Sequence, residues 1–384
     1  MVAMSYIFDA MSSWSGCSRA NLKVKGCDLE PCSIGVDLGG TNLRIAAYAQ
    51  EKGLLETLNL TTRRSAGRDA VILDLIEAVQ TLRKTFGSTY SFAGVGVATP
   101  GPMEWPEGRL LDPPNLPGWE NFPLRSDLER ALGIDVQVEN DANVAALAEC
   151  LLGQGQVLGV DSLCMITLGT GVGAGIVLRG SIWHGMNGMA GESGHVSVDY
   201  NGPLCPCGTR GCLELYASAT GLVRMAEEMI GQEESVGLAS LHTTSGGLSA
   251  GSLFELGRAG DPDAQKIFHR MGVALGRALA GLVNALNLPL YVLGGGVAAA
   301  WPLFASWMFD ELACGSSLYR LTDPLHPPAS VAAKAKTHVL SAKLGASSGL
   351  LGACLLPFTA SHGQRSGAKN DTMICANGRV AADA

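Results

Sequence analysis

Four side chains that bind metal ions well lie close together in the segment 195–212 of this chain. His195, Cys205, Cys207 and Cys212 supply one imidazole and three thiols, which is the number and type of ligands in a closed tetrahedral Zn²⁺ site. A proline and two glycines between the ligands allow the backbone to fold back tightly. The spacing therefore predicts a structural zinc loop.

A disulfide framework is the alternative reading of these cysteines. The chain has 11 cysteines spread over 384 residues, an odd number, whereas secreted disulfide scaffolds are small and cysteine-dense. The first residues lack a basic start followed by an apolar core, and no apolar run is long enough to span a bilayer. We therefore expect a reducing, cytoplasmic location, in which clustered cysteine and histidine indicate a metal site.

Two glycine-rich turns, each flanked by strand-like sequence, are typical of phosphate binding. The first reads DLGGTNLR from residue 37 and the second LGTGVGAG from residue 168. Glycines let backbone N–H groups approach a phosphate, threonine adds a hydroxyl donor, and the aspartate could hold Mg²⁺ directly or through water. An ordinary glycine hairpin is the alternative for each turn. The candidate nucleotide-binding residues here are Asp37, Gly39, Gly40, Thr41, Asn42, Arg44, Thr170 and Gly171.

A third glycine turn, LGGGV from residue 293, follows an apolar strand. Gly295 and Gly296 would allow an adenine ring to lie flat on the backbone. A Walker A loop is excluded because no Gly-Lys-Ser/Thr follows the glycines, and a Rossmann turn does not fit the strand that follows the second turn. The three turns together predict a nucleotide cleft.

A carboxylate at the junction of a strand and a helix could act as a general base. Asn140 and Asp141 lie in VENDAN, where a strand pattern meets a helical one. A carboxylate there would take the proton of a sugar hydroxyl while that oxygen attacks phosphorus. A helix N-cap is the alternative, since both residue types are favoured caps, but capping explains only one of them.

The segment GMAGESGH adds a carboxylate and an imidazole that point the same way. Glu192 and His195 could hold vicinal hydroxyls of a pyranose. One ring nitrogen of His195 would bind zinc while the other faces the sugar, so that the metal fixes the ring. Glu214, just after Cys212, could add a second carboxylate. Solvated surface is the alternative for both glutamates.

The composition is that of a compact, glycine-rich globular protein with room for two domains, and the alternation of strand and helix patterns along the chain predicts an α/β architecture. Apolar residues make up 47% of the 384 positions, charged residues only 16%, and 50 are glycine. The net charge of −8 leaves no basic footprint for nucleic acid. Each half of the chain carries a strand–glycine turn–strand pattern, which predicts a duplicated nucleotide-binding fold with a cleft between two lobes.

Hydrophobic spacing predicts the elements that position these motifs. A β-hairpin is expected around Gly39 and a second around the turn that follows residue 168. Asp69 is the expected N-cap of the first helix, and the polar segment 232–251 is an expected surface loop. Helices are expected over residues 69–86, 124–132, 142–153, 263–286 and 343–358.

The motifs ENDAN, LGTGVGAG, GMAGESGH and CPCGTRGCLE, in this order after DLGGTNLR, resemble the ROK family of repressors, open reading frames and sugar kinases. The resemblance runs from about Cys32 to Leu356, and PPNLPGWENFPL is similar to the glucokinase branch. It implies two ribonuclease-H-like lobes of the sugar kinase, heat-shock ATPase and actin superfamily. The implied division is a poorly ordered extension 1–31, a small lobe 32–140 completed by a C-terminal helix 342–357, a large lobe 141–341 with the zinc loop, and a disordered tail 358–384.

The resemblance also implies a role for each candidate residue. Asp141 would be the catalytic base, and the phosphates of ATP would meet the turns at Gly39–Thr41 and Thr170–Gly171. Zinc would be held by the four ligands of the segment 195–212. The hexose would be bound by Asn140, Asp141, Glu192, His195 and Glu214, with Gly101 and Asn115 closing the site.

The implied activity is ATP-dependent phosphorylation of a hexose, with glucose expected from the glucokinase-like segment. Kinases of N-acetylmannosamine or N-acetylglucosamine are the alternative, because they share the same site residues. A non-catalytic sugar-responsive regulator is disfavoured because Asp141 and both phosphate turns are present and the extension is too short for a winged helix-turn-helix domain. A heat-shock-type ATPase is disfavoured because we expect no peptide-binding domain. Expected cofactors are ATP, Mg²⁺ and structural Zn²⁺, with no nucleic-acid or membrane partner. The donor (ATP or polyphosphate) and the oligomeric state (including a homodimer or homotetramer) stay open.

Overall fold

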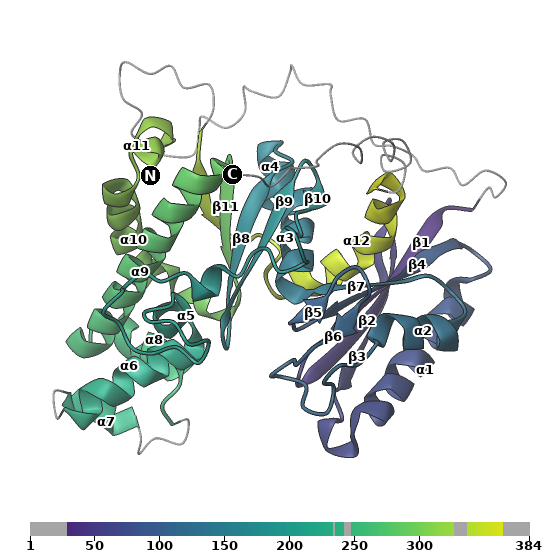
Figure 1. The fold of residues 1–384 in the computed structure, drawn as a ribbon, viewed down its shortest axis with the longest axis horizontal. Helices are drawn as coiled ribbons and strands as arrows, with labels where there is room; N and C mark the ends of the chain where they lie inside the picture. Colours follow the sequence, from purple (N-terminus) through teal and green to yellow (C-terminus); the bar gives the residue numbers. More distant parts are fainter. Residues whose placement is uncertain (1–28, 233–234, 242–246, 326–335, 364–384) are drawn as a thin grey trace, which may run out of the picture.

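The computed structural model describes residues 29–232, 235–241, 247–325 and 336–363, which form two five-stranded sheets with helices between and around them (Figure 1). The predicted extension lies outside the described residues except for residues 29–31, and so does the tail beyond residue 363. Within the described ranges, no helix is both long enough and apolar enough to cross a membrane.

The first sheet joins an antiparallel meander to two parallel strands, in the order β3-β2-β1-β4-β7. Strand β1 is buried along almost its whole length because elements cover both faces of the sheet, and its larger apolar side chains, at alternate positions from Cys32 to Leu38, pack on one of these faces. The pairing of β1 with β2 confirms the hairpin predicted around Gly39. The strands are β1 Pro31–Leu38, β2 Asn42–Ala49, β3 Gly53–Thr61, β4 Ser91–Thr99 and β7 Val136–Asn140.

The second sheet repeats this topology, in the order β10-β9-β8-β11-β12. Strand β8 pairs antiparallel with β9 and parallel with β11, as β1 pairs with β2 and β4. The repetition confirms the internal symmetry that the two glycine turns predicted. The strands are β8 Leu163–Leu168, β9 Val172–Leu178, β10 Ser181–Ile182, β11 Leu290–Gly294 and β12 His338–Ser341.

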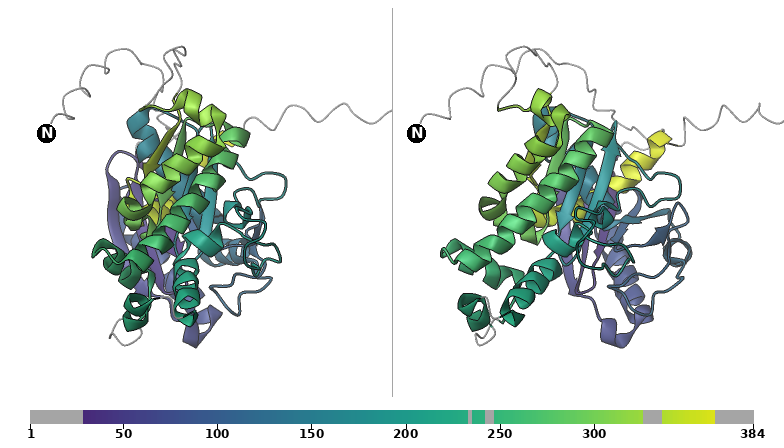
Figure 2. Two further views of the ribbon diagram at one scale, coloured as in Figure 1. Left: turned by 90° about the vertical axis from the view of Figure 1, so that its left-hand side faces the viewer. Right: turned by 60° about the vertical axis from the view of Figure 1, so that its left-hand side comes forward.

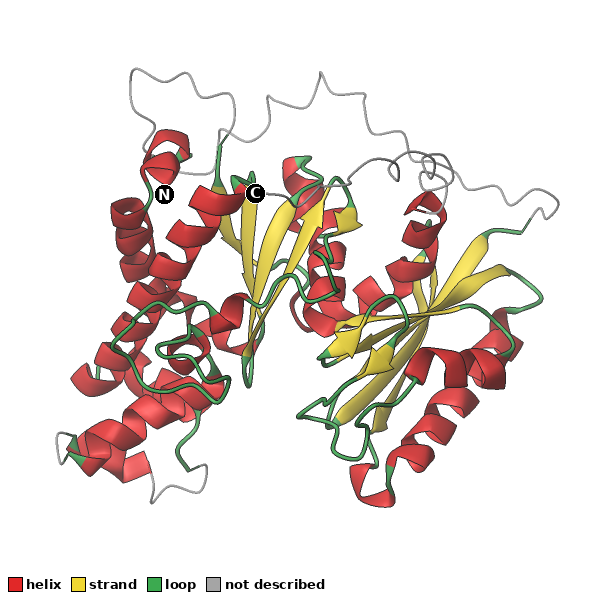
Figure 3. Ribbon diagram, viewed as in Figure 1, coloured by secondary structure: helices red, strands yellow, loops and turns green. Residues whose placement is uncertain are grey.

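Two helices, α3 (Asp141–Leu151) and α12 (Ser348–Gly363), lie between the sheets (Figure 3). Helix α12 packs on β1 and β4, α3 packs on β8 and β9, and the two helices pack on each other. Their apolar side chains share one core cluster with both sheets. Gly352 permits the close crossing, since a Cβ at that position would collide with the carbonyl of Val144. The start of α3 is therefore held between the sheets by packing on both sides.

The remaining helices cover the outer faces. Helices α1 and α2 complete the core of the first sheet, and Figure 2 shows α9 and α10, in green, side by side across the second sheet. A short hairpin, β5–β6, leaves the first sheet after β4. These elements are α1 Arg68–Phe86, β5 Met103–Glu104, β6 Arg109–Leu110, α2 Leu124–Leu132, α4 Gln154–Leu158, α5 Glu214–Ala217, α6 Ala219–Gly231, α7 Val236–Leu241, α8 Ala250–Arg258, α9 Pro262–Leu286, α10 Trp301–Gly315 and α11 Ser317–Thr322.

Helix boundaries differ from the predictions at several places: α3 ends at Leu151 rather than at residue 153, and α12 begins at Ser348 rather than at residue 343. Gly67, with φ of 86°, is the N-cap of α1, and Asp69 lies in the first turn without capping it. The prediction of Asp69 as the cap is therefore wrong, because a glycine ahead of it turns the chain into the helix. The predicted loop 232–251 is wrong in its middle, where Val236–Leu241 form α7.

The last helix continues beyond the point where the sequence predicts a disordered tail. Pro357 lies inside α12, which runs on to Gly363 (Figure 1). A proline removes one hydrogen bond and crowds the carbonyl four residues earlier, here that of Ala353. Packing against the first sheet holds the helix across this defect. The predicted start of the tail at residue 358 is therefore wrong, because residues 358–363 belong to α12. The division of the chain into lobes at residue 140 stays a prediction.

Candidate functional site

The junction of β7 and α3 brings two predicted hexose residues together. Asn140 ends β7 and is the N-cap of α3, where its side-chain oxygen accepts hydrogen bonds from the backbone N–H groups of Ala142 (2.9 Å) and Asn143 (3.4 Å). The capping alternative is thus correct for Asn140. A Cβ on Gly101 would lie 3.2 Å from Asn140 Nδ2, so that amide nitrogen and Gly101 border the same space.

Asp141, the first residue of α3, carries the most strongly perturbed carboxylate of the site. Protein around it desolvates the carboxylate and raises its pKa to about 6, and the negative charges of Asp37 and Glu192 act in the same direction. A 2.8 Å hydrogen bond from the N–H of Ala142 opposes the shift. By accessible surface Asp141 is exposed, so the carboxylate lies at the surface, within reach of a substrate, although protein atoms surround it closely enough to shift its pKa. Three carboxylates from separate segments therefore converge here.

Asp37, at the end of β1, is bound by Arg44 of β2. The Arg44 Nε lies 3.1 Å from Asp37 Oδ2, and Nη1 donates to the carbonyl of Ala346 at 2.8 Å. The guanidinium therefore joins the first phosphate turn to the segment before α12. This arrangement gives Arg44 a positioning role and leaves Asp37 with one oxygen already bonded.

The first phosphate turn is a tight connection between β1 and β2. The N–H of Gly39 donates to the carbonyl of Asn42 (2.9 Å), while Thr62 bonds the carbonyls of Gly39 (2.8 Å) and Thr41 (2.9 Å). Thr41 and Asn42 are exposed. A Cβ on Gly40 would lie 2.8 Å from the carbonyl oxygen of Asn115. The predicted hexose residue Asn115 thus lies beside the first phosphate turn.

The second phosphate turn, between β8 and β9, is held by Thr220 and Glu214. The carbonyl of Thr170 accepts from the hydroxyl of Thr220 (2.9 Å), and the N–H of Val172 donates to Glu214 Oε2 (2.9 Å). The same carboxylate packs directly against Gly171. Glu214 therefore supports a phosphate turn with one oxygen, and a hexose contact through its other oxygen stays a prediction.

The third glycine turn lies against the second one. Gly295 has φ of 87°, and a Cβ there would collide with the backbone of Leu168. Glycine is therefore required at this position for the packing of β11 on β8, whereas Gly296 is exposed at the start of a 3₁₀ turn, Gly296–Ala300. The flat adenine contact predicted for both glycines stays a prediction.

A shallow groove between α6 and α8 adjoins the second phosphate turn through the hydrogen bond from Thr220 to Thr170. No local pattern indicates this groove, and three of its eight lining residues fall in the segment 232–251 that is predicted as a surface loop. The groove is lined by Ala219, Thr220, Val223, Arg224, Glu227, Leu248, Ser249 and Ala250.

The segment that carries Glu192 and His195 lies against β9. A Cβ on Gly191 or on Gly194 would collide with the backbone carbonyl of Ala174 or of Val172, so the two glycines allow close contact with this strand. Glu192 is exposed, and its charge reaches the carboxylate at the start of α3. The structure thus places this segment beside both the predicted base and the second phosphate turn.

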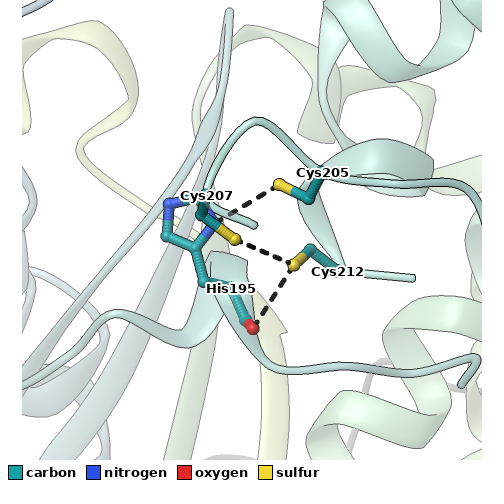
Figure 4. Close-up of side chains that lie close together, drawn as sticks. All are labelled: His195, Cys205, Cys207 and Cys212. Carbon is teal, nitrogen blue, oxygen red and sulfur yellow. Dashed lines mark hydrogen bonds between the residues drawn. The ribbon is translucent and has the colours of Figure 1, made fainter. Parts of the chain in front are cut away.

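The four predicted metal ligands converge in one cluster (Figure 4). Their donor atoms all lie within 4.8 Å of one another. His195 Nδ1 lies 3.8 Å from Cys205 Sγ, and the sulfurs of Cys207 and Cys212 are 3.5 Å apart, too far for a disulfide bond of about 2.05 Å. A tetrahedron with metal–sulfur bonds of about 2.3 Å has edges of roughly 3.8 Å. The cluster therefore has the dimensions of a four-coordinate metal site.

Comparisons with known proteins agree with this arrangement. A family model described as the ROK family matches residues 33–359. A glucokinase from Halalkalibacterium halodurans is 38% identical over 269 residues, which cover 70% of this chain and 81% of that protein. An N-acetylmannosamine kinase from Yersinia pestis is 31% identical over 269 residues, covering 70% of this chain and 83% of that protein.

A solved structure shows the same fold. It is a ROK family glucokinase from Streptomyces griseus in complex with glucose and AMPPNP, with a TM-score of 0.64 and 30% identity, and the match covers 85% of this chain and 98% of that one. The two sheets and the helices between them therefore have the two-lobed architecture of sugar kinases.

Proposed function

Because this chain belongs to the ROK family, we propose that it is an ATP-dependent sugar kinase that converts glucose to glucose 6-phosphate. The observation that carries the proposal is the position of Asp141. Its carboxylate has a pKa raised to about 6, it lies beside Asn140 and within electrostatic reach of Glu192 and Asp37, and these residues border the two glycine turns. The proposed base, the proposed sugar-binding residues and the proposed phosphate turns would thus act at one point.

The reaction follows from this geometry. Asp141 accepts the proton of the sugar 6-hydroxyl as that oxygen attacks the γ-phosphorus, and the bond from phosphorus to the β-γ bridging oxygen breaks to release ADP. A carboxylate with a pKa near 6 is ionised at neutral pH and more basic than an ordinary aspartate. Desolvation of the carboxylate therefore serves the proton transfer.

The nucleotide is proposed to lie across the three glycine turns. Backbone N–H groups of the turns at Gly39–Thr41 and Thr170–Gly171 would bind its phosphates, and the groove between α6 and α8 would accept the nucleoside. Mg²⁺, when bound with the nucleotide, offsets the negative charge of the phosphates. Asp37 fits this ion only through its second oxygen or through water, because Oδ2 is bonded to Arg44.

Zinc is the metal that fits the cluster of one imidazole and three thiols. His195 would bind it through Nδ1, the nitrogen that faces Cys205, which leaves Nε2 for a sugar hydroxyl. When bound, the ion would tie His195 to the segment Cys205–Cys212, which leads directly into α5, where Glu214 supports the second phosphate turn. Its proposed contribution is therefore structural.

Phosphorylation of N-acetylmannosamine is the second candidate. It is supported by the 31% identity to the Yersinia pestis enzyme, below the 38% identity to the glucokinase. An acetamido group at C2 would require added volume and a partner for its amide, or it would bury unpaired polar atoms at about 1–3 kcal/mol each.

A coupled assay on a panel of hexoses tests the proposal, with ATP and with polyphosphate as donors. We expect glucose with ATP to give the highest kcat/KM, exceeding that of N-acetylmannosamine at least about tenfold, equivalent to about 1.4 kcal/mol. A preference for the acetylated sugar would change the proposed substrate and leave the assignment as a sugar kinase intact. Release of phosphate from ATP without any sugar phosphate would refute the kinase itself.

A further inference from the structure

A buried carboxylate lies directly behind the proposed base. Glu139, the residue before Asn140 on β7, is only 4% exposed. Its Oε1 accepts hydrogen bonds from the N–H of Asn140 (2.9 Å) and from Nδ2 of Asn143 (2.9 Å). Both donors belong to the junction of β7 and α3 that presents Asp141. Glu139 therefore stabilises this junction through hydrogen bonds from the buried side.

The second oxygen of Glu139 is bound by a histidine from a distant part of the sequence. His184 Nε2 lies 2.6 Å from Glu139 Oε2. This distance is that of a hydrogen bond between the two side chains, both of which are largely shielded from water. A hydrogen bond in such a shielded position can hold two segments in a fixed relation.

The ring of His184 also stacks on an aromatic side chain. Trp105 lies parallel to it, with ring centroids 3.9 Å apart and an angle of 17° between the planes. Trp105 directly follows β5 in the segment that begins at Gly101. A Cβ on Gly188 would lie 2.6 Å from the Cβ of Trp105, so the loop after His184 packs closely on the same tryptophan.

The loop after His184 leads to the predicted hexose residue Glu192. It closes on itself through a 3.2 Å hydrogen bond from the N–H of Ala190 to the carbonyl of His184. Fixing His184 therefore also fixes the start of the loop that presents Glu192. The histidine thus contacts all three segments that carry the hexose-binding residues Gly101, Asn140 with Asp141, and Glu192.

We propose that His184 is a positioning residue of the hexose site, acting through Glu139 and Trp105 to hold these three segments together. The proposal rests on the sugar kinase activity proposed above. The phosphate turns are held by other groups, among them Thr62, Thr220 and Glu214. Loss of His184 should consequently weaken the binding of the hexose and leave the binding of the nucleotide unchanged.

Steady-state kinetics of three variants test the proposal. We expect His184→Ala to lower kcat/KM for glucose at least about tenfold, with KM for ATP within about twofold of the parent value, because misplacement of reacting groups by about an ångström can cost a hundredfold. His184→Gln keeps a donor for Glu139 and should recover part of the loss. His269→Ala is the matched control, because His269 also pairs with a tryptophan, Trp307, but on the outer helices. It should leave glucose kinetics unchanged.

A double-mutant cycle separates positioning from simple stability. Trp105 is 40% exposed, so Trp105→Ala should fold even if His184→Ala does not, and it should also raise KM for glucose while Trp105→Phe does so less. The effects of His184→Ala and Trp105→Ala should be non-additive, since the residues act through one contact.

Two outcomes would overturn the positioning role. One is glucose kcat/KM within twofold of the parent in folded His184→Ala or in Trp105→Ala. The other is an equal rise of the glucose and ATP KM values, which would indicate general loosening. Calorimetric glucose binding and turnover by the parent are measured first, because a parent that binds and phosphorylates no hexose would refute the proposed function before any variant is compared.

Discussion

Asp141 differs from the other carboxylates of the site in what surrounds it. Asp37 is bonded to Arg44, and Glu214 accepts a hydrogen bond from a phosphate turn. Glu192 is exposed. Desolvation raises the pKa of Asp141 to about 6, and the negative charges of Asp37 and Glu192 add to this shift. The basicity of Asp141 is thus set first by its own position and then by the neighbouring charges.

The raised pKa of Asp141 predicts the pH dependence of the reaction. The base must be ionised, so kcat/KM for glucose should be low below pH 6, rise through a midpoint near the pKa of about 6, and level off above it. Glu192→Gln removes one of the charges that raise this pKa and should move the midpoint to lower pH. A midpoint near 4 in the parent enzyme would contradict the assignment of Asp141 as the base.

At the scale of elements, the zinc loop connects two parts of the site. It supplies His195 on one side and leads directly from Cys212 into α5 with Glu214 on the other. We expect one zinc per chain, and we expect Cys207→Ser to lose the metal, lower the melting temperature and raise KM for glucose, because the ring of His195 is no longer held. Elemental analysis, thermal unfolding and steady-state kinetics measure these three effects.

Cys314→Ser is the matched control for this change. Cys314 is exposed, as Cys207 is, but lies on α10 away from the cluster. This variant should keep its zinc and its activity. Absence of zinc from freshly purified parent protein would count against the metal site. Full activity after complete chelation would mean that the metal does not support the hexose site.

The elements that the sequence predicted well are those with local signals. The hairpin at Gly39 and the C-cap of α2 at Gly133 follow from glycine conformation and hydrophobic spacing within a few residues. The pair of Glu139 and His184 joins residues 45 positions apart, and no local pattern indicates it. The continuation of α12 beyond Phe358 was not predicted, because a proline ordinarily ends a helix, and packing on a sheet rather than propensity holds α12 across Pro357.

At the scale of the whole molecule, the residues of the site come from both sheets and from the helices between them. The first phosphate turn belongs to the first sheet and the second to the second sheet. We expect the two halves to close on glucose, which would exclude water from the γ-phosphate. Solution scattering should show a smaller radius of gyration at saturating glucose. An unchanged radius, with binding shown by calorimetry, would mean that the free protein is already closed.

The most direct test of the account compares the parent with Asp141→Asn for the formation of glucose 6-phosphate from glucose and ATP. The amide keeps the shape and the polarity of the side chain but cannot accept the proton. We predict glucose binding within about threefold of the parent by calorimetry, and a fall in kcat of about 10²–10⁴, the range that general-base catalysis contributes. A variant that forms glucose 6-phosphate with kcat within about threefold of the parent, less than about 1 kcal/mol in the barrier, would contradict the central claim that Asp141 is the base.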